Sequence, residues 1–321
     1  MFIPWTEIES FHNIRKFMKA YPENLNSNNT VLYRSKVKLH GTNAAVQVVP
    51  GGTLIAQSRS SEISVTNDNA GFARWVASHN PMDWHLAEGL VIFGEWCGPG
   101  VQKGVAISEI PQKIFAVFAA RRLDQSDTLI VEPEELAGLV NGIKDVYVLP
   151  WYNEEVLSVD WTLPSEELVA STSIINGWVN AVEENDPWVE NTFNVKGTGE
   201  GLVFYPVSSE HLGNKNFNNL VFKAKGEKHK NIKTASPAQV NPEHASSINQ
   251  FVELVLTEAR LEQGAGGVYD TKNISKFLAW ISNDVQKETQ DELDASGLTW
   301  AQVSKALTNK ARVWYIEKSK Q

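Results

Sequence analysis

The segment with the clearest chemical potential is Lys38–Asn43 (KLHGTN), which stands between a β-rich stretch and a predicted hairpin. A lysine beside a glycine-permitted tight turn can present its amine to an incoming phosphate as a nucleophile. At the ordinary lysine pKa of about 10.4, only about one amine in a thousand is neutral near neutral pH. Neighbouring cations and a metal on the phosphate would lower that pKa. The candidate cations are Lys36, Arg59, Lys223 and Lys225.

Taken alone, this motif is weak evidence, because Lys-x-His-Gly or Lys-x-Asp-Gly occurs by chance in roughly one in ten chains of this length. Further segments of matching character follow it in order: Ser58–Ser60 around Arg59, Phe93–Trp96 with Glu95, Lys113–Phe118, Glu200–Phe204 and Phe222–Lys225. Singly, each has an ordinary interpretation as an edge-strand acid, a core aromatic or a solvated lysine. Their joint order and spacing make coincidence a poor explanation.

Other signatures of chemistry are missing from the sequence. There is no Gly-x-x-x-x-Gly-Lys-Ser/Thr phosphate loop, and the segment 98–100 lacks the strand-to-helix context of a dinucleotide fingerprint. One cysteine and seven scattered histidines offer no zinc-ligand spacing. No Gly-x-Ser-x-Gly nucleophile elbow is present either.

The elements that must position these residues are mostly predicted strands. Strand character covers 30–39, 89–96, 113–123, 199–207 and 219–225, and a hairpin is predicted for 44–58 around Pro50-Gly51-Gly52. Helical patterning covers 133–141 and 164–184. Hairpins of this kind favour antiparallel sheets in an α+β protein over a doubly wound parallel sheet.

The C-terminal part of the chain has a different periodicity. Residues 233–242 have the composition of a linker. Beyond them, apolar residues recur with the helical period from Ile248 to Ala259 and from Ile274 to Val285. A third helix is predicted to start with Thr299 as its N-cap and to run to about Tyr315.

Charge is strongly segregated along the chain. The 321 residues carry a net charge of -9, but residues 124–190 hold fifteen acidic residues against Lys144, which leaves the rest with a net charge of +5. Residues 211–235 contain six lysines against Glu227, and 304–321 contain five basic residues against Glu317. Solvated charged faces explain this as well as a polyanion site does, so the overall negative charge does not exclude a nucleic-acid partner.

The ordered segments resemble motifs I, Ia, III, IIIa, IV and V of the covalent nucleotidyltransferases. The form Lys-x-His-Gly-Thr-Asn is similar to the RNA ligase 2 family of ATP-dependent RNA ligases. The resemblance implies an α+β fold of two antiparallel sheets with flanking helices, a nucleotidyltransferase or ATP-grasp-like ligase core. This adenylyltransferase domain would span 1–234, and an all-helical C-terminal module would span 235–321.

The resemblance also implies a three-step reaction on RNA ends or nicked duplex RNA, with Mg²⁺ or Mn²⁺. Lys38 would attack the α-phosphate of ATP to form lysyl-AMP, AMP would pass to an RNA 5′-phosphate, and a 3′-OH would then displace AMP. The resemblance also implies roles in nucleotide binding. Glu95 would hold the ribose, Phe118 would stack on adenine, and Glu200 would bind or orient metal. Lys223 and Lys225 would contact the α-phosphate, while Asn43 and Arg59 would serve the phosphate and the joining steps.

Two positions depart from the family pattern, which often has acidic residues where Val37 and Ala119 stand. ATP is expected over GTP on the resemblance alone. A DNA ligase or a capping-type transferase is the same-class alternative, although both usually append a domain of short strands. A non-catalytic nucleotide- or RNA-binding module is the other alternative.

The same sequence bears on the setting of the protein. No run approaches the roughly 18 apolar residues of a membrane span, and no signal peptide is visible at the N-terminus. The single cysteine, Cys97, fits a cytoplasmic or other reducing compartment. No obligate protein partner is evident from the sequence.

Overall fold

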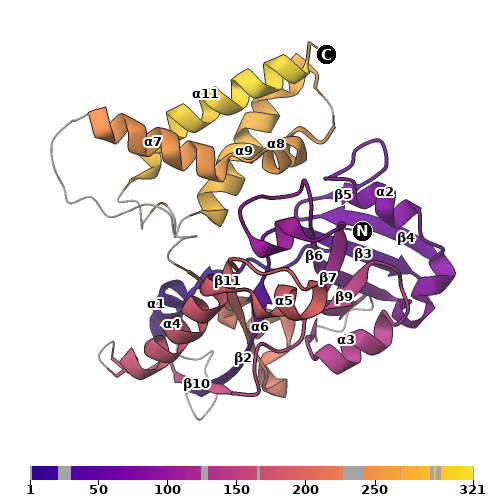
Figure 1. The fold of residues 1–321 in the computed structure, drawn as a ribbon, viewed down its shortest axis with the longest axis vertical. Helices are drawn as coiled ribbons and strands as arrows, with labels where there is room; N and C mark the ends of the chain where they lie inside the picture. The colour runs from indigo at the N-terminus through magenta and orange to yellow at the C-terminus, as the bar shows by residue number, and fades with distance from the viewer. Residues whose placement is uncertain are drawn as a thin grey trace. The chain divides into compact units, whose positions relative to one another are not determined.

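A computed structural model describes residues 2–20, 30–123, 129–164, 167–226, 242–267, 269–289, 293 and 298–320. The chain forms two compact units, one of Met1–Ser64 with Phe72–Gly226 and one of Val65–Gly71 with Glu227–Gln321 (Figure 1). The predicted boundary between 234 and 235, together with most of the predicted linker, lies outside the described residues.

The first unit contains two sheets. The five-stranded sheet has the order β1 (Glu9–Ser10), β12 (Phe222–Lys225), β11 (Gly201–Pro206), β2 (Thr30–Lys38) and β10 (Leu157–Asp160). Its pairings are antiparallel except for β1 with β12. The predicted antiparallel character is therefore confirmed for this sheet.

The second sheet has seven strands and includes the predicted hairpin. Its order is β5 (Glu62–Ile63), β4 (Thr53–Ser58), β3 (Thr42–Val49), β6 (Leu90–Cys97), β7 (Ile114–Arg122) and β8 (Leu129–Ile130), and β9 (Val146–Val148) pairs with β7. Among the pairings of its described strands, only that of β7 with β9 is parallel. The α+β fold with two largely antiparallel sheets is thus as expected.

Strand alternation sorts the five-stranded sheet into a polar face and an apolar face. Directly opposite residues share a face, and the register places Lys38 opposite Gly201, which in turn lies opposite Lys225. Lys36, Val203 and Lys223 form the next row on that same face. All the cations of β2 and β12 at these positions therefore project from one side of the sheet.

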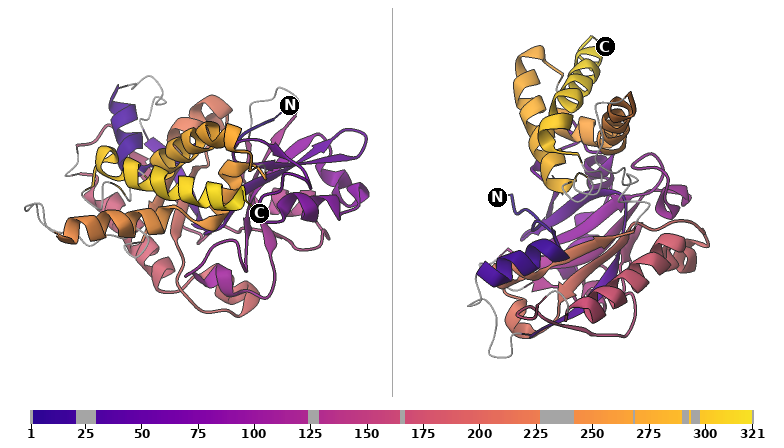
Figure 2. Two further views of the ribbon diagram at one scale, coloured as in Figure 1. Left: turned by 90° about the horizontal axis from the view of Figure 1, so that it is seen from above. Right: turned by 90° about the vertical axis from the view of Figure 1, so that its left-hand side faces the viewer.

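Helices α1 (Phe11–Ala20) and α4 (Val169–Glu184) contact the five-stranded sheet, α1 at β1 and β12 and α4 at β10, β11 and β12 (Figure 2). The rings of Phe204 and Phe222 stack at 4.6 Å between their centroids, and Trp178 of α4 stacks on Phe204. Phe11 of α1 meets Phe222 edge-on at 5.4 Å. This aromatic layer fixes β11 and β12 beside each other, and it lies opposite the lysine face.

Helices and turns also flank the seven-stranded sheet. They are α2 (Phe72–Ala77), η2 (Pro81–Ala87) and α3 (Pro133–Leu139), and η3 (Ala106–Glu109) follows β6 in the chain. Phe72 and Trp75 pack on Trp96 and Phe115 in an aromatic cluster. Cys97 is a free, fully buried thiol, as expected for a small apolar side chain.

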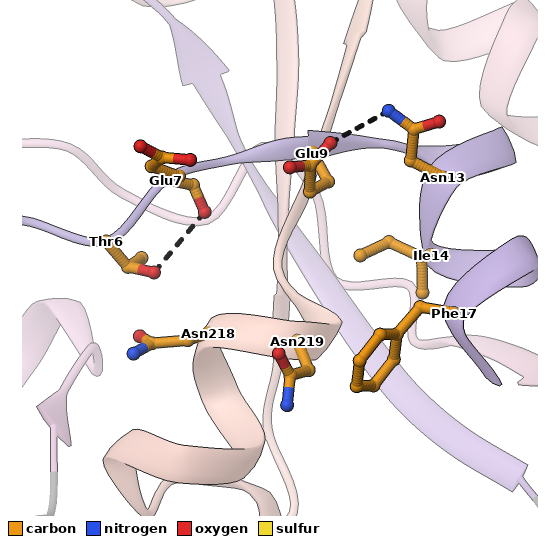
Figure 3. Close-up of a pocket in the computed structure, with 8 residues that line it drawn as sticks. All are labelled: Thr6, Glu7, Glu9, Asn13, Ile14, Phe17, Asn218 and Asn219. Carbon is orange, nitrogen blue, oxygen red and sulfur yellow. Dashed lines mark hydrogen bonds between the residues drawn. The ribbon is translucent and has the colours of Figure 1, made fainter. Parts of the chain in front are cut away.

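Three more short elements belong to the first unit: α5 (Pro187–Phe193), η4 (Ser209–His211) and α6 (Asn214–Leu220). A cavity of 660 Å³ lies where α1 and α6 meet the N-terminal segment, lined by Glu7, Glu9, Asn13 and Phe17 among others (Figure 3). The predicted site residues are not among its lining residues.

The described part of the second unit is helical from residue 242 onward. It comprises α7 (Pro242–Val255), α8 (Glu258–Ala265), η5 (Thr271–Asn273), α9 (Ile274–Glu288) and α11 (Trp300–Lys318). Phe251, Ile281 and Leu307 are fully buried in its core. Thr299 caps α11 in a reciprocal capping box with Gln302, so the predicted N-cap is confirmed.

Two helix predictions differ in detail from the structure. The apolar period from 248 to 259 suggested one helix, but α7 ends at Val255 and Thr257 caps a separate helix, α8. The helix predicted from 164 begins only at Val169. No helix in the described part of the chain is long and apolar enough to cross a membrane.

Candidate active site

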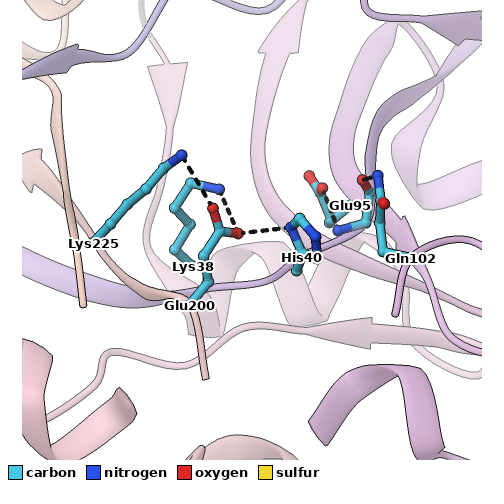
Figure 4. Close-up of polar contacts among 7 residues, drawn as sticks. Lys38, His40, Glu95, Gln102, Glu200 and Lys225 are labelled. Atoms are coloured by element: carbon cyan, nitrogen blue, oxygen red, sulfur yellow. Dashed lines mark hydrogen bonds and ion pairs between the residues drawn. The ribbon is translucent and has the colours of Figure 1, made fainter. Parts of the chain in front are cut away.

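Lys38 occupies the last position of β2, and its amine lies 2.7 Å from Glu200 Oε2 (Figure 4). Glu200 directly precedes β11 and is only 4% exposed. The Nζ of Lys225, at the end of β12, lies 3.5 Å from the other oxygen of Glu200. The buried carboxylate of Glu200, at the start of β11, is thus held between one lysine of β2 and one lysine of β12, the two strands on either side of β11.

Backbone packing explains why these strands approach so closely. Gly201 has a φ of +149°, and a Cβ there would lie 2.2 Å from the carbonyl oxygen of Ala224. A larger residue would therefore push β11 away from β12. The absence of a side chain at Gly201 lets Glu200 reach both Lys38 and Lys225.

His40 was part of the predicted motif but had no assigned role. Its Nδ1 lies 3.4 Å from Glu200 Oε2, and its side chain is 33% exposed. Although burial alone would raise the pKa of Glu200, the charges of Lys38 and Lys225 and the hydrogen bond with His40 hold that pKa well below its usual range. Glu200 is therefore an ionised carboxylate at neutral pH.

Glu95 lies on β6, directly opposite Asn43 of β3. Its Oε1 accepts the backbone N–H of Gly41 at 3.0 Å. Burial raises the pKa of Glu95 to about 7, and this exceeds the lowering effect of Lys38, the Gly41 N–H and Arg59. Glu95 and Glu200 therefore share one site with opposite pKa shifts.

The motif turn is fixed from both sides by polar contacts. Gln102 Nε2 donates to the carbonyl oxygen of Gly41 at 3.3 Å, while the Gly41 N–H is held by Glu95 (Figure 4). A Cβ on Gly41 would lie 2.4 Å from the Trp96 carbonyl oxygen, so glycine is required for this close approach. Sequence reasoning missed Gln102, because nothing in its surroundings resembles a motif.

The remaining predicted residues occupy three places. Arg59 follows β4 and acts electrostatically on Glu95. Lys223 lies on the same face of β12 as Lys225, two residues away. Phe118 lies on β7, is 7% exposed and packs edge-on against Trp5 at 5.0 Å.

Lys36 differs from the expectation that it belongs to the cation cluster of the nucleophile. It is fully buried, and its amine donates to the carbonyl oxygens of Phe118 and Val131 at 2.9 and 2.7 Å. Strand alternation places Lys36 and Lys38 on one face of β2. It could not indicate which groups lie across from that face.

The sequence of residues 33–225, well over half of the chain, matches the profile of the RNA ligase family. The chain belongs to the RNA ligase family. The matched range begins within β2 and ends with Lys225, so it includes every residue of the site described above.

Several solved RNA ligase structures align with this chain at low sequence identity. A Naegleria gruberi RNA ligase with PPi aligns at 19% identity and a TM-score of 0.42, over 70% of this chain and 56% of that chain. A mutant of that ligase with ATP and Mn gives 18% identity and a TM-score of 0.44, over 71% and 57% of the two chains. An archaeal ATP-dependent RNA ligase gives 13% identity and a TM-score of 0.44, over 98% and 66%.

This RNA ligase family member therefore spans little more than half the length of the Naegleria gruberi chains that it matches. No curated protein matches the sequence.

Proposed function

We propose that this chain is an ATP-dependent RNA ligase that joins RNA 3′-OH and 5′-phosphate ends. In the first step, Lys38 Nζ bonds to the α-phosphorus of ATP, the bond to the β-phosphate oxygen breaks, pyrophosphate leaves and the amine loses a proton. An oxygen of the RNA 5′-phosphate then bonds to the phosphorus of lysyl-AMP, while the bond from Lys38 Nζ to that phosphorus breaks and the amine regains a proton. Finally the 3′-OH loses its proton and bonds to the 5′-phosphate, and AMP leaves as the phosphodiester forms. This proposal is supported above all by the position of the Lys38 amine, which lies 2.7 Å from the buried carboxylate of Glu200 in a chain that belongs to the RNA ligase family.

The ion pair orients the nucleophile. Because the pKa of Glu200 is held well below its usual range, this carboxylate is a poor proton acceptor but a good hydrogen-bond acceptor for the Lys38 amine. Lys225, only 11% exposed in its side chain, adds a positive charge beside the amine. Two lysines on one strand face, Lys223 and Lys225, suit the α-phosphate, whose charge they would stabilise during the transfer.

The other site residues suit a nucleotide with its ribose near Glu95. In the proposed arrangement, Glu95 accepts a ribose hydroxyl, Phe118 stacks on the adenine ring, and Asn43 and Arg59 serve the phosphate and the joining steps. The opposite pKa shifts of the two acids support different roles. Glu95, with a pKa of about 7, is readily protonated, whereas Glu200 stays ionised and attracts cations.

The donor set also fits Mg²⁺ or Mn²⁺ bound together with ATP. Among the described residues, no group of three or more His, Cys, Asp or Glu side chains could hold a metal ion by itself. Mg²⁺ is usually bound through one or two carboxylates together with substrate phosphates, and Glu200 offers one such carboxylate. The bound ion would supply charge neutralisation at the phosphates.

The expected nucleic-acid substrate is RNA ends or nicked duplex RNA. The described residues from 242 onward contain no strand, which distinguishes this unit from the strand-rich domains expected of DNA ligases and capping-type transferases. Three lysines of the lysine-rich segment 211–235, at positions 228, 230 and 233, lie outside the described residues.

Covalent labelling tests the proposal directly. The full chain is incubated with Mg²⁺ and ATP labelled at the α-phosphate, denatured and examined for bound label. We expect stable label from α-labelled ATP, none from γ-labelled ATP and none on Lys38→Ala. Labelling with GTP in place of ATP tests for a capping-type transferase. Sealing assays with nicked RNA and with nicked DNA then distinguish an RNA ligase from a DNA ligase.

A folded, nucleotide-free protein that takes no label from either ATP or GTP would contradict the proposal. A nucleotide- or RNA-binding module would then be the better account.

A further inference from the structure

Phe118 occupies a β-bulge. The register between β6 and β7 pairs Gly94 with Val117 and then Phe93 with Ala119, so Phe118 is the extra residue on β7. Phe118 is also absent from the described pairings of β7 with β8 and with β9. A bulge redirects its side chain and leaves backbone groups outside the ladder. The Phe118 carbonyl therefore needs a hydrogen-bond partner from elsewhere.

The partner of that carbonyl is Lys36. Its Nζ lies 2.9 Å from the Phe118 carbonyl oxygen and 2.7 Å from that of Val131, just after β8. Lys36 belongs to the other sheet, on the same face as Lys38. One side chain thus connects the strand of the nucleophile with the bulge that carries the proposed adenine platform.

The cost of burying this amine indicates that it has a specific role. Lys36 is 0% exposed, although unpaired buried charge is strongly unfavourable. Its Nζ lies 4.8 Å from the Trp151 ring centroid and 5.5 Å from that of Tyr205, which partly compensates for the lost water. An apolar side chain would fill the same space without this penalty, but it would leave the Phe118 carbonyl without a partner.

We infer that Lys36 is a positioning residue for nucleotide binding, whose amine holds the bulged backbone at Phe118 and so fixes the ring on which adenine stacks. This inference rests on the proposed function. It assigns to Lys36 an effect on ATP binding that is separate from the chemical step at Lys38. It also predicts that the effect of Lys36 passes through the Phe118 ring.

The test measures the rate of covalent labelling of the full chain against ATP concentration. For Lys36→Met, loss of the two hydrogen bonds of the buried amine should raise the half-saturating ATP concentration about tenfold, while the saturated rate changes less than about twofold. Phe118→Ala should raise the half-saturating concentration as well. The double variant should show no further increase, because the two residues act as one unit.

A stability control separates positioning from a general loss of folding. Val31→Ala removes buried volume from the same strand, where Val31 is 0% exposed and pairs with Val159. It should lower the unfolding midpoint and leave the half-saturating ATP concentration unchanged. If Lys36→Met does not give folded protein, Lys36→Gln, which keeps one shorter donor, is measured by the same criterion.

The outcomes separate this inference from the proposed function. If the wild type takes up label but the half-saturating ATP concentration of the Lys36 variant equals that of Val31→Ala, only the positioning role is overturned. The positioning role is also overturned if Lys36→Met raises the half-saturating ATP concentration by the same factor in the wild type and in Phe118→Ala. Wild-type protein that takes no label would overturn the proposed function, and the inference with it.

Discussion

The two units of the chain treat charged side chains differently. In the two-sheet unit, Lys36, Glu183, Asp186 and Glu200 are each at most 8% exposed. In the described part of the helical unit, the buried polar side chains are the uncharged Asn69 and Thr289. Acids and bases of that unit pair instead where both side chains keep some exposure to water, as Lys318 does with Glu262 at 2.9 Å and Arg260 with Asp284 at 2.8 Å.

This difference indicates where the chain has specialised for chemistry. A buried charge costs several kcal/mol unless it is paired and hydrogen-bonded. Its persistence in the first unit, at Glu200 beside β11 and at Lys36 within β2, therefore points to a function that needs it. The helical unit follows the ordinary pattern of apolar core and charged surface, which suits binding rather than bond formation.

The largest expected effect is that of Glu200→Gln. It removes the charge that orients Lys38 but keeps the size of the side chain, so the labelling rate with α-labelled ATP should fall at least about 100-fold. The matched control is Glu253→Gln, because Glu253 is 72% exposed and lies in the helical unit. Equal labelling of the two variants would show that buried and exposed acids do not differ in the proposed way.

A smaller effect, on a different step, is expected when residues 236–321 are removed. All proposed site residues belong to the first unit, so lysine labelling should stay within about threefold of the full chain. Sealing of nicked RNA should fall at least about tenfold if this module makes the expected contacts with the RNA backbone. Loss of labelling in a truncated protein that still folds would show that the module boundary is wrong.

The buried carboxyl of Asp186 should make the stability of the first unit depend on pH. It caps α5 by accepting the N–H groups of Trp188 and Val189, each at 3.0 Å, and burial raises its pKa from 3.8 to about 6 against those hydrogen bonds. Because the folded-state pKa is the higher one, its stabilising contribution is present below about pH 4 and is lost as the pH rises through about 6.

Asp186→Asn keeps the capping oxygen but cannot ionise. The stability of the wild type relative to this variant should therefore fall between about pH 4 and pH 7, as measured by urea midpoints. Asp160→Asn is the control, since half-buried Asp160 accepts the Thr162 N–H in a turn. A constant difference between wild type and Asp186→Asn across this range would refute the assignment.

The smallest effect is expected at the surface of the helical unit. Lys318 pairs with Glu258 and Glu262 and is 30% exposed in its side chain. Because exposed ion pairs are screened by water and salt, Lys318→Ala should change the free energy of unfolding by less than about 1 kcal/mol. Calorimetry at low and at high salt measures this, and a larger loss would place Lys318 among the structurally important charges.

The strand ends of the candidate site were predictable from sequence because their motifs are local. Lys38, Glu200 and Lys225 each stand at a strand boundary, and antiparallel pairing brings such boundaries together. The third helix of the tail was likewise predictable, since Thr299 carries its own capping signal.

What could not be predicted depends on packing between elements. The strand period places Lys36 on the face of Lys38, but the partner carbonyls at Phe118 and Val131 are 82 and 95 residues away. The bulge at Phe118 depends on the register of two strands. The buried cap at Asp186 depends on how α5 packs, and a short polar residue before Pro187 suggests a helix start without revealing its burial.

The pairing of β2 with β11 also has a consequence for biosynthesis. Lys38 and Glu200 are separated by 162 positions in sequence, and Lys225 is still further along the chain. Contacts of such long range form slowly and only after the intervening chain exists. During translation, therefore, the proposed nucleophile Lys38 would leave the ribosome long before Glu200, the carboxylate proposed to orient it. A nascent chain shorter than about 225 residues would be unable to take up AMP, however well its early strands had paired.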